Sequence, residues 1–256
     1  MASSSSSLPP SSSPSSTLVV FDFDWSFADQ DTDRYVFEVL APELRTQLRE
    51  AKKTTQWTDN VAQHLVRLHE QGGTREQIVE VLQGLPVHPA MIRGVQKAKA
   101  RTETTTRFLC LSNSNSVYIN TILKHHHMEN FFEEIITNPA EFLDNGLLQL
   151  NRRVDPSGEQ HGCKVGCSAN MCKGAELDAF MARHGGWESW DRVVYVGDGG
   201  NDFCPLLRLR SQDVALVRMY RELSRRIVKD AEASPLKCTP VPWGGAWEVE
   251  KWLLEN

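Results

Sequence analysis

The segment Val20-Phe21-Asp22-Phe23-Asp24-Trp25-Ser26 decides the fold of this chain. It follows an apolar run that starts at Leu18, and it places two carboxylates, two residues apart, directly after that run. A buried strand carries no charge, so we expect both acids just past its C-terminal end, where open α/β sheets place their ligand sites. Two acids so close repel each other unless a cation lies between them or one holds a proton. The alternative interpretation is a solvated turn after a strand.

After this segment, a long stretch with helical spacing is followed by a stretch in which strand and helix patterns alternate. Residues 30–100 carry apolar residues at helical spacing and no strand pattern. Short apolar runs resume at 107–111, 134–137, 192–196 and 213–217, with helical patterns between them. Such alternation predicts a parallel sheet covered by helices on both faces. We therefore predict an α/β, Rossmann-like fold with a small all-helical cap inserted after the first strand.

The same patterns predict the domain organisation. Residues 1–16 are Ser-rich and Pro-rich low-complexity sequence, which predicts a disordered tail. Residues 17–29 and 101–256 are expected to form the core, and residues 30–100 the helical cap. An insertion directly after the first strand would lie over Asp22 and Asp24, so we expect the cap to act as a lid or a specificity element.

Composition excludes several classes of function. A net charge of -5 argues against non-specific nucleic-acid binding, which needs a basic surface. No apolar run approaches the roughly 20 residues of a membrane span. Six cysteines in 256 residues do not indicate a disulfide scaffold. With no secretory signal visible, the expected location is the cytoplasm.

Three further polar positions follow strands or begin helices. Ser112 follows one apolar run, Asp198 and Asp202 lie in the glycine-rich segment after another, and Lys173 begins a helical pattern. In a parallel sheet these groups converge at one edge. Carboxylate-rich sites suit a hard cation such as Mg²⁺, whose remaining ligands are water and phosphate.

Each of these positions has an ordinary explanation when it is taken alone. Ser112 could be a helix N-cap, Lys173 a solvated charge, and Gly199-Gly200 a simple turn. Their shared placement, each where a strand ends or a helix starts, is what favours a common site.

In this order the motifs resemble those of the haloacid dehalogenase superfamily. Asp22-Phe23-Asp24-Trp25-Ser26 is similar to its first motif, Ser112 to its second, Lys173 to its third, and the segment 197–202 to its fourth. The resemblance covers about residues 17–255. Within the superfamily, segments 168–173, 195–205 and 241–243 resemble phosphoethanolamine/phosphocholine phosphatases and their pyridoxal-phosphate-phosphatase relatives.

The resemblance implies roles for the acidic residues. Asp22 would attack phosphorus and form a phospho-aspartyl intermediate, and Asp24 would act as the general acid and base. Mg²⁺ would be held by the Asp22 carboxylate, the Asp24 backbone carbonyl and Asp198. Asp202 would support the metal through water or order its loop.

It also implies which groups hold the phosphate. Ser112 and Lys173 would bind the phosphoryl oxygens as charge builds in the transition state. Asn201 would support them or contact the substrate. Ser26 and Asn113, which lie within the first and second motifs, are further candidates for contact with the substrate.

The substrate remains open because the chain departs from the branch pattern. Two acids are thought to recognise an amino head group there; Asp33 matches one, but Asn113 stands in place of the other. Trp25 could compensate through a cation–π contact, or it could simply pack. Phosphocholine, phosphoethanolamine, pyridoxal phosphate, thiamine monophosphate and pyrophosphate all remain candidates.

A second candidate metal site lies in the irregular stretch before Lys173. His161, Cys163, Cys167 and Cys172 offer an imidazole and three thiols, which could bind a structural Zn²⁺. The alternative is three unrelated cysteines, since the spacing is not that of a standard zinc knuckle.

Three functions follow from these observations. The first is a Mg²⁺-dependent phosphatase acting on a small phosphomonoester, with neither nucleic acid nor membrane as a partner. The second is a phosphotransferase or mutase that uses the same aspartyl phosphate. The third is a non-catalytic phospholigand-binding or zinc-stabilised interaction module. The sequence does not predict the oligomeric state.

Overall fold

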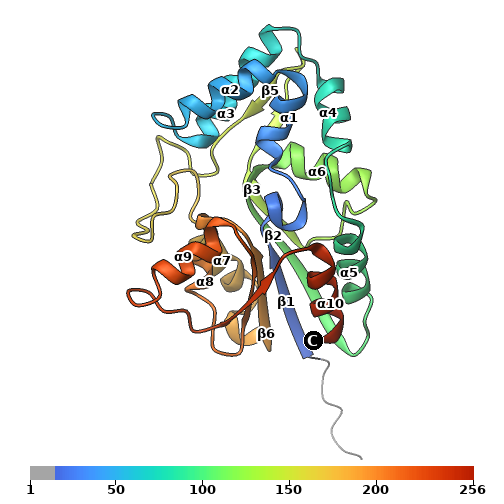
Figure 1. Ribbon diagram of the computed structural model, residues 1–256, viewed down its shortest axis with the longest axis vertical. Coiled ribbons are helices and arrows are strands. Elements are labelled where there is room, and N and C mark those ends of the chain that lie inside the picture. Colours follow the sequence, from blue (N-terminus) through green and yellow to red (C-terminus); the bar gives the residue numbers. More distant parts are fainter. Residues whose placement is uncertain (1–14) are drawn as a thin grey trace, which may run out of the picture.

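A six-stranded parallel sheet forms the centre of the protein in the computed structural model, which describes residues 15–256 (Figure 1). The strand order is β3-β2-β1-β6-β7-β8, and every neighbouring pair is parallel. The strands are β1 (Ser15–Phe21), β2 (Thr104–Asn115), β3 (Glu134–Asn138), β6 (Arg192–Gly197), β7 (Val214–Arg218) and β8 (Thr239–Trp243). The predicted α/β, Rossmann-like class is confirmed.

Helices cover both faces of this sheet because the strands are apolar on both sides. In β1, Val19 and Phe21 pack into one hydrophobic cluster, whereas Leu18 and Val20 pack into the other. The first cluster contains α5 (Pro89–Lys99), α6 (Ser116–His125) and α10 (Ala246–Glu255). The second contains α7 (Lys173–Arg183), η2 (Trp187–Ser189), α8 (Phe203–Leu206) and α9 (Glu222–Lys229). Consecutive residues of a strand therefore pack against the helices on opposite faces of the sheet, which explains why the strands are unbroken apolar runs in the sequence.

The sequence analysis missed the edge strand β8, because it carries two prolines. Thr239 donates its backbone N–H to Asp213, and the Trp243 carbonyl accepts from Met219, so alternate residues bond to the neighbouring segment. Pro240 and Pro242 occupy the intervening positions. Their missing N–H groups thus face away from β7, which is the arrangement that an edge strand tolerates.

The parallel register brings the ends of three strands to one edge. Phe21 pairs with Cys110 in β2 and with Val196 in β6. Asp22 is therefore level with Gly197, one residue before Asp198, and β2 continues past this level through Ser112 to Asn115. The parallel sheet therefore brings Asp22, Ser112 and Asp198 together at the carboxyl ends of its strands.

Four helices lie over this edge, at the top of Figure 1. They are α1 (Thr32–Leu40), α2 (Pro42–Ala51), α3 (Trp57–Glu70) and α4 (Arg75–Gln83). A short antiparallel hairpin, β4 (Ala140–Phe142) with β5 (Leu148–Leu150), packs against α3 and joins the same apolar cluster. The part of the chain above the sheet is therefore not purely helical, since the hairpin comes from the second half of the sequence.

Helix α5 lies beside α10 rather than with α1–α4 (Figure 1). Arg93 forms an ion pair with Glu250 at 2.8 Å, and a Cβ atom on Gly94 would lie 2.8 Å from the Glu250 Cα. Such close packing attaches α5 to the layer that flanks the sheet. We infer that the boundary between cap and core falls before α5, near residues 85–88, rather than at residue 100.

The predicted tail, residues 1–16, lies outside the described residues except for Ser15 and Ser16, which begin β1. Across residues 15–256, every helix is too short or too polar to cross a membrane.

Candidate active site

Asp22 is the first residue beyond β1, and its surroundings fix its carboxylate. Its backbone N–H donates to the Val196 carbonyl at 2.9 Å, which ties it to β6. Its Oδ1 accepts from the Phe23 N–H at 2.7 Å, and the side chain is almost completely buried. Burial, together with the charge of Asp202, raises the pKa of Asp22 to about 7, although Lys173 opposes this shift. The carboxylate needs positive charge nearby to stay ionised.

Asp24 lies in a tight turn, η1 (Phe23–Phe27), that follows Asp22. The turn requires a left-handed backbone at Trp25, with φ of 58°, which is strained for a bulky residue. Asp24 Oδ2 accepts from the Thr32 hydroxyl at 3.2 Å, whereas its Oδ1 is buried and accepts from nothing within residues 15–256. Burial and the charges of Asp31 and Asp33 raise the pKa of Asp24 well above its ordinary value. Burial and the neighbouring acids therefore favour the protonated form of Asp24.

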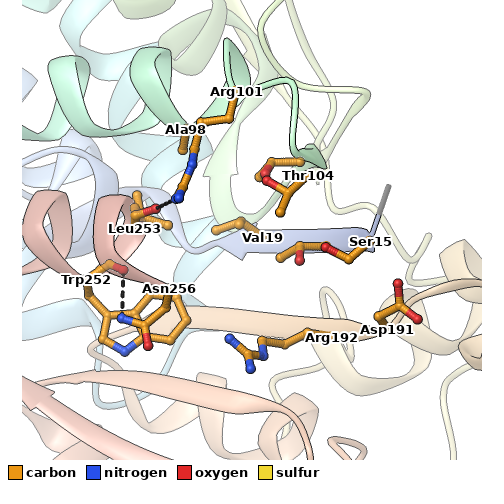
Figure 2. A pocket seen from close by; sticks show the side chains of 12 residues that line it. Ser15, Val19, Ala98, Arg101, Thr104, Asp191, Arg192, Trp252, Leu253 and Asn256 are labelled. Atoms are coloured by element: carbon orange, nitrogen blue, oxygen red, sulfur yellow. Dashed lines mark hydrogen bonds between the residues drawn. The ribbon is translucent and has the colours of Figure 1, made fainter. Parts of the chain in front are cut away.

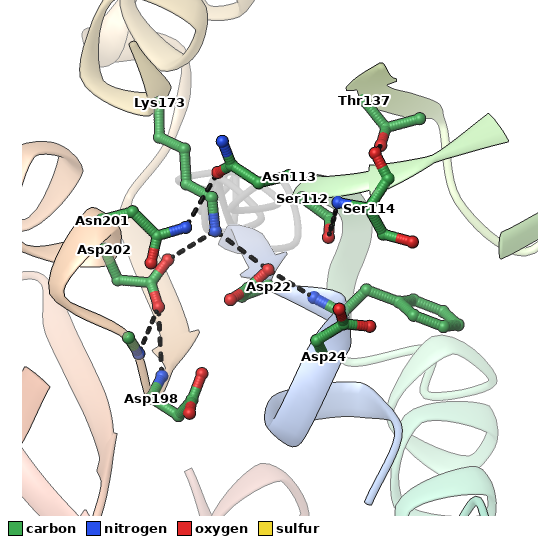
Figure 3. A network of polar contacts seen from close by, with 12 residues as sticks. Asp22, Asp24, Ser112, Asn113, Ser114, Thr137, Lys173, Asp198, Asn201 and Asp202 are labelled. Atoms are coloured by element: carbon green, nitrogen blue, oxygen red, sulfur yellow. Dashed lines mark hydrogen bonds and ion pairs between the residues drawn. The ribbon is translucent and has the colours of Figure 1, made fainter. Parts of the chain in front are cut away.

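Lys173 begins α7 and is fully buried between two carboxylates (Figure 3). Its Nζ lies 2.9 Å from Asp22 Oδ1 and 2.7 Å from Asp202 Oδ1. Burial lowers the pKa of Lys173, but Asp202 and Asp22 raise it by more, so the net shift is upward. The ammonium group stays charged in the middle of the site.

Both oxygens of Asp202 are occupied by protein donors. Oδ1 accepts from Lys173 and from the Tyr195 hydroxyl at 2.7 Å. Oδ2 accepts from the backbone N–H groups of Asp198 and Gly199 at 3.1 and 2.9 Å. Asp202 thus holds the glycine-rich loop, which includes the turn η3 (Gly200–Asp202), against α7. This position favours a supporting role over direct metal binding.

Asp198 completes a group of three acids. Carboxylate oxygens of Asp22, Asp198 and Asp202 lie within 4.8 Å of one another. Burial and the charges of Asp22 and Asp202 raise the pKa of Asp198 to about 8. Lys173 and Arg221 partly counter this negative charge. A divalent cation between Asp22 and Asp198 would relieve the repulsion, and oxygen ligands suit Mg²⁺. The donor set therefore fits the metal.

Amide side chains form the next part of the wall. Asn113 accepts from Asn201 at 2.8 Å and donates to Asn170 at 3.2 Å, which links the end of β2 to the glycine-rich loop and to the irregular segment before α7. Ser112 is buried, and its Oγ accepts from the Ser114 N–H at 3.2 Å (Figure 3). Ser112 is not a helix N-cap, because Asn115 caps α6 by accepting from the Tyr118 N–H.

These residues line a cavity of about 540 Å³ between the sheet edge and the cap. On the cap side, Asp33 Oδ2 accepts from Trp57 Nε1 at 2.7 Å, and burial raises the pKa of Asp33 to about 7. The sequence-predicted residues that line the cavity are Asp22, Asp24, Trp25, Asp33, Ser112, Asn113, Asp198 and Asn201. Lys173 and Asp202 lie just behind this wall, in contact with Asp22 and with the loop of Asp198.

Ser26 lies elsewhere. It is buried, and it lines a separate cavity of about 150 Å³ that includes His88 and Trp247. Its position does not support the prediction that it binds substrate, because the cavity that it lines does not contain Asp22, Asp24 or Asp198.

The Trp25 ring lines the cavity, but the protein itself supplies a cation for it. The Arg221 guanidinium carbon lies 3.7 Å from the ring centroid, and that of Arg218 lies 5.5 Å from it. A substrate cation would have to compete with Arg221 for this ring. The structure therefore favours an internal cation–π contact over the predicted contact with a head group.

The predicted zinc ligands come together only in part. Cys163, Cys167 and Cys172 lie close to one another, and the fourth group among them is Cys204. His161 is not in this cluster, because its Nε2 forms a hydrogen bond with the Ser168 carbonyl at 2.8 Å. The prediction of His161 as a ligand is wrong in this structure.

Sequence reasoning missed four contributors: Thr32, Asn170, Tyr195 and Arg221. Tyr195 offered a signal, since a tyrosine inside an apolar strand needs a partner for its hydroxyl group. Thr32, Asn170 and Arg221 offered none, because polar residues in a helix or an irregular loop are ordinary.

A third hollow lies at the opposite, amino-terminal edge of the sheet (Figure 2). It measures about 170 Å³ and is lined by side chains such as Thr104, Arg192 and Trp252. It contains none of the acids described above, whereas the cavity of about 540 Å³ contains Asp22, Asp24 and Asp198, so that cavity is the candidate active site.

Comparison with known structures supports the class of protein. A haloacid dehalogenase family hydrolase from Salmonella enterica aligns with a TM-score of 0.62 at 15% identity, covering 95% of this chain and 72% of that one. A substrate-bound phosphoserine phosphatase aligns with a TM-score of 0.52 at 13% identity, covering 83% and 96%. At this identity the likeness concerns the fold.

Sequence comparison adds the activity. A thiamine phosphate phosphatase-like protein of Arabidopsis thaliana is 31% identical over 93% of this chain and 94% of its own length. Inorganic pyrophosphatase 2 of the same plant is 31% identical, covering 93% and 82%, and the Bos taurus pyridoxal phosphate phosphatase PHOSPHO2 is 28% identical, covering 92% and 96%.

The fold, the acidic site and these relatives define a phosphatase of the haloacid dehalogenase superfamily. Within that class, the chain belongs to the family described as "Putative Phosphatase", whose model matches residues 17–256. It is therefore an enzyme that hydrolyses phosphoric monoesters.

Proposed function

We propose that this phosphatase hydrolyses a small phosphomonoester in two steps, with Asp22 as nucleophile and Mg²⁺ as cofactor. The observation that carries this proposal is the position of Asp22, buried at the sheet edge with Lys173 2.9 Å away and Asp198 in the same acidic group. A carboxylate held in this way has a fixed direction of attack and little freedom to lose.

In the first step, an Asp22 carboxylate oxygen attacks phosphorus, and the bond from phosphorus to the leaving oxygen breaks. Asp24 gives its proton to that oxygen. Its raised pKa and its buried, unpartnered Oδ1 both suit a group that is protonated before the step. The product of this step is a phospho-aspartyl group on Asp22 and a free alcohol.

In the second step, water attacks the phosphorus of the aspartyl phosphate. Asp24 is now ionised and takes a proton from this water, so that inorganic phosphate leaves and Asp22 is restored. Lys173 and the Ser112 hydroxyl would stabilise the phosphoryl oxygens in both steps. Asn113 and Asn201, which already bond to each other at 2.8 Å, would hold the rest of the substrate.

Asp22 and Asp198 would hold the Mg²⁺, and the predicted third ligand is the Asp24 backbone carbonyl. When bound, the ion would offset the repulsion between the nucleophile and the phosphate. The raised pKa values of Asp22 and Asp198, which arise from burial and from the neighbouring acids, support this assignment, because a cation between the two carboxylates would favour their ionised forms.

The relatives point to compact substrates. Their names include thiamine phosphate, pyridoxal phosphate and pyrophosphate, and a cavity of about 540 Å³ can hold molecules of this size. Asp33, whose pKa is raised to about 7, would recognise a donor or a cation on the leaving group. Phosphocholine and phosphoethanolamine belong to the same test set.

The proposal is tested by phosphate release from these compounds and from an aryl phosphate, with and without Mg²⁺. We expect activity that requires Mg²⁺ and that falls at least about 1,000-fold in Asp22→Asn. After rapid acid quenching, phosphate from a labelled substrate should stay on the wild-type chain and not on this variant. Full activity of Asp22→Asn would refute the assignment of the nucleophile.

Transfer to an alcohol tests the phosphotransferase alternative. In the presence of a small alcohol, a hydrolase releases mainly inorganic phosphate, whereas a transferase forms mainly a new phosphate ester. We expect hydrolysis to dominate, because the chain belongs to a phosphatase family.

A further inference from the structure

Four cysteine thiols meet at a point outside the catalytic cavity. Cys163 and Cys167 come from the irregular loop after β5, Cys172 immediately precedes α7, and Cys204 lies in α8. Their sulfur atoms all lie within 4.8 Å of one another. The closest pairs are Cys163–Cys167 at 3.6 Å, and Cys163–Cys204 and Cys172–Cys204 at 3.7 Å.

These separations have the size that a tetrahedral metal site requires. Zinc–sulfur bonds of about 2.3 Å in a tetrahedron place neighbouring sulfurs about 3.8 Å apart. A disulfide would need about 2.05 Å, and all four cysteines are free. The arrangement is therefore a group of separate sulfur atoms around a common centre, rather than one or two crosslinks.

The surrounding backbone is shaped to admit these sulfurs. A Cβ atom on Gly174 would lie only 2.7 Å from Cys204 Sγ, so a glycine at this position lets α8 approach α7. The Val165 N–H donates to Cys163 Sγ at 3.4 Å, and the Ala175 N–H donates to Cys172 Sγ at 3.5 Å. Backbone donors of this kind orient ligating groups around a metal.

Positive charge lies next to the cluster. Arg226, in α9, donates to the carbonyls of Val165 and Gly200, and so bridges the cysteine loop to the glycine-rich loop. Arg208 lies beside Gly174. A zinc ion with four thiolates carries a net negative charge, and these guanidinium groups, which also form ion pairs with Asp230 and Asp178, would balance part of it.

We propose that Cys163, Cys167, Cys172 and Cys204 bind one structural Zn²⁺. Four protein ligands leave no open position for water or substrate, which is the form of a structural rather than a catalytic zinc site. Four sulfur ligands in a tetrahedron suit zinc, with iron as the main competitor. His161, which bonds to a carbonyl, is not a ligand.

The position of the site defines what the metal does. Cys172 is adjacent to Lys173, and Cys204 is two residues beyond Asp202, so the ion holds both ends of the buried Lys173–Asp202 pair. Asn170, which donates to Asn138 and accepts from Asn113, lies between Cys167 and Cys172. Zinc would therefore fix the loop that forms one wall of the catalytic cavity.

The test is the metal content of the full chain, purified in reducing buffer containing Mg²⁺ and no chelator. We expect about one zinc per chain by elemental analysis, and less than a tenth of that in Cys167→Ser and in Cys204→Ser. The matched control is Cys238→Ser, another buried free thiol that lies outside the cluster, which should keep its zinc. These readouts do not depend on phosphatase activity.

A second measurement covers the case in which the variants fail to fold. In the native wild-type chain, a thiol reagent should release the zinc in step with the modification of four cysteines. Substitution with Co²⁺ should give the thiolate-to-metal absorption bands of a tetrahedral site. The proposal is overturned by a wild-type chain that contains iron or no metal, by disulfides among these cysteines, or by zinc that persists in both cluster variants.

Discussion

The Lys173 ammonium group lies 2.9 Å from the Asp22 carboxylate, although α7 and β1 are far apart in the sequence. The contact is buried on both sides, and Asp202 shares the same ammonium at 2.7 Å. One positive charge therefore stabilises two carboxylates, and in the proposed function the same side chain also serves catalysis.

Lys173→Met should damage both properties. Removing the ammonium leaves two buried carboxylates without a counterion, which costs about 3–5 kcal/mol of unfolding free energy at pH 8. Turnover should fall at least about 100-fold, because the phosphoryl oxygens lose their cation. Urea unfolding and steady-state kinetics measure the two effects.

The double variant Lys173→Met/Asp202→Asn separates them. It removes one of the two carboxylate charges that lose their counterion, so part of the lost stability should return while activity stays low. A single Lys173→Met variant as stable as the wild type would contradict the buried ion pairs.

Asp24→Asn should slow the enzyme in a way that depends on the leaving group. Asparagine cannot supply a proton, so an alkyl phosphate should lose about 100-fold or more in kcat. An aryl phosphate with an acidic phenol needs little protonation and should lose much less. Equal losses for both substrates would argue that Asp24 acts by position or charge rather than as a proton donor.

Asp33→Asn should change the pH dependence of stability. Burial, with the charge of Asp31, raises the pKa of Asp33 from 3.8 to about 7, so the folded state binds a proton more tightly than the unfolded state. The stabilisation from that proton is complete below pH 3.8 and is lost as the pH rises through about 7. The wild type therefore has a buried charge at pH 8 that Asn lacks, and Asn can still accept from Trp57.

We expect Asp33→Asn to be more stable than the wild type at pH 8, by at most about 4 kcal/mol, with a difference that shrinks towards pH 4. Chemical unfolding at several pH values provides the measurement. A constant difference across this range would mean that Asp33 does not titrate as its burial implies.

Gly94→Ala should destabilise the packing of α5 on α10. The added Cβ would meet the Glu250 Cα at 2.8 Å, which is backbone that cannot move aside easily, so we expect a loss of about 1–3 kcal/mol. Gly84→Ala is the matched control, because its Cβ would meet nothing closer than 3.6 Å. Thermal unfolding of both variants checks this, and a neutral Gly94→Ala would argue against the inferred boundary before α5.

Much of the fold could be predicted because β1 is apolar at every position from Leu18 to Phe21 and then ends at Asp22. A strand of that kind must be buried on both faces, and this requirement leads to a parallel sheet with helices on each side. The strand β8 could not be predicted in this way, since Pro240 and Pro242 are tolerated only because no strand of residues 15–256 lies beyond it. The hairpin β4–β5 was too short to give a pattern.

The sequence by itself determined which chemical groups follow the apolar runs: Asp22 and Asp24 after the first, Ser112 after the next, and Asp198 after a later one. It could do so because the ends of apolar runs are local features, set by where apolar residues stop and polar residues start. The expectation that the strand ends before Ser112 is wrong, because β2 continues to Asn115. Only the tertiary structure decided the partners of each group.

Asp202 bonds to Tyr195 and Lys173, Trp25 lies under Arg221, and Cys204 replaces His161 in the thiol cluster. These pairings depend on how close segments that follow different strands come in the folded chain. The order of residues in the sequence contains no direct measure of the distance between such segments.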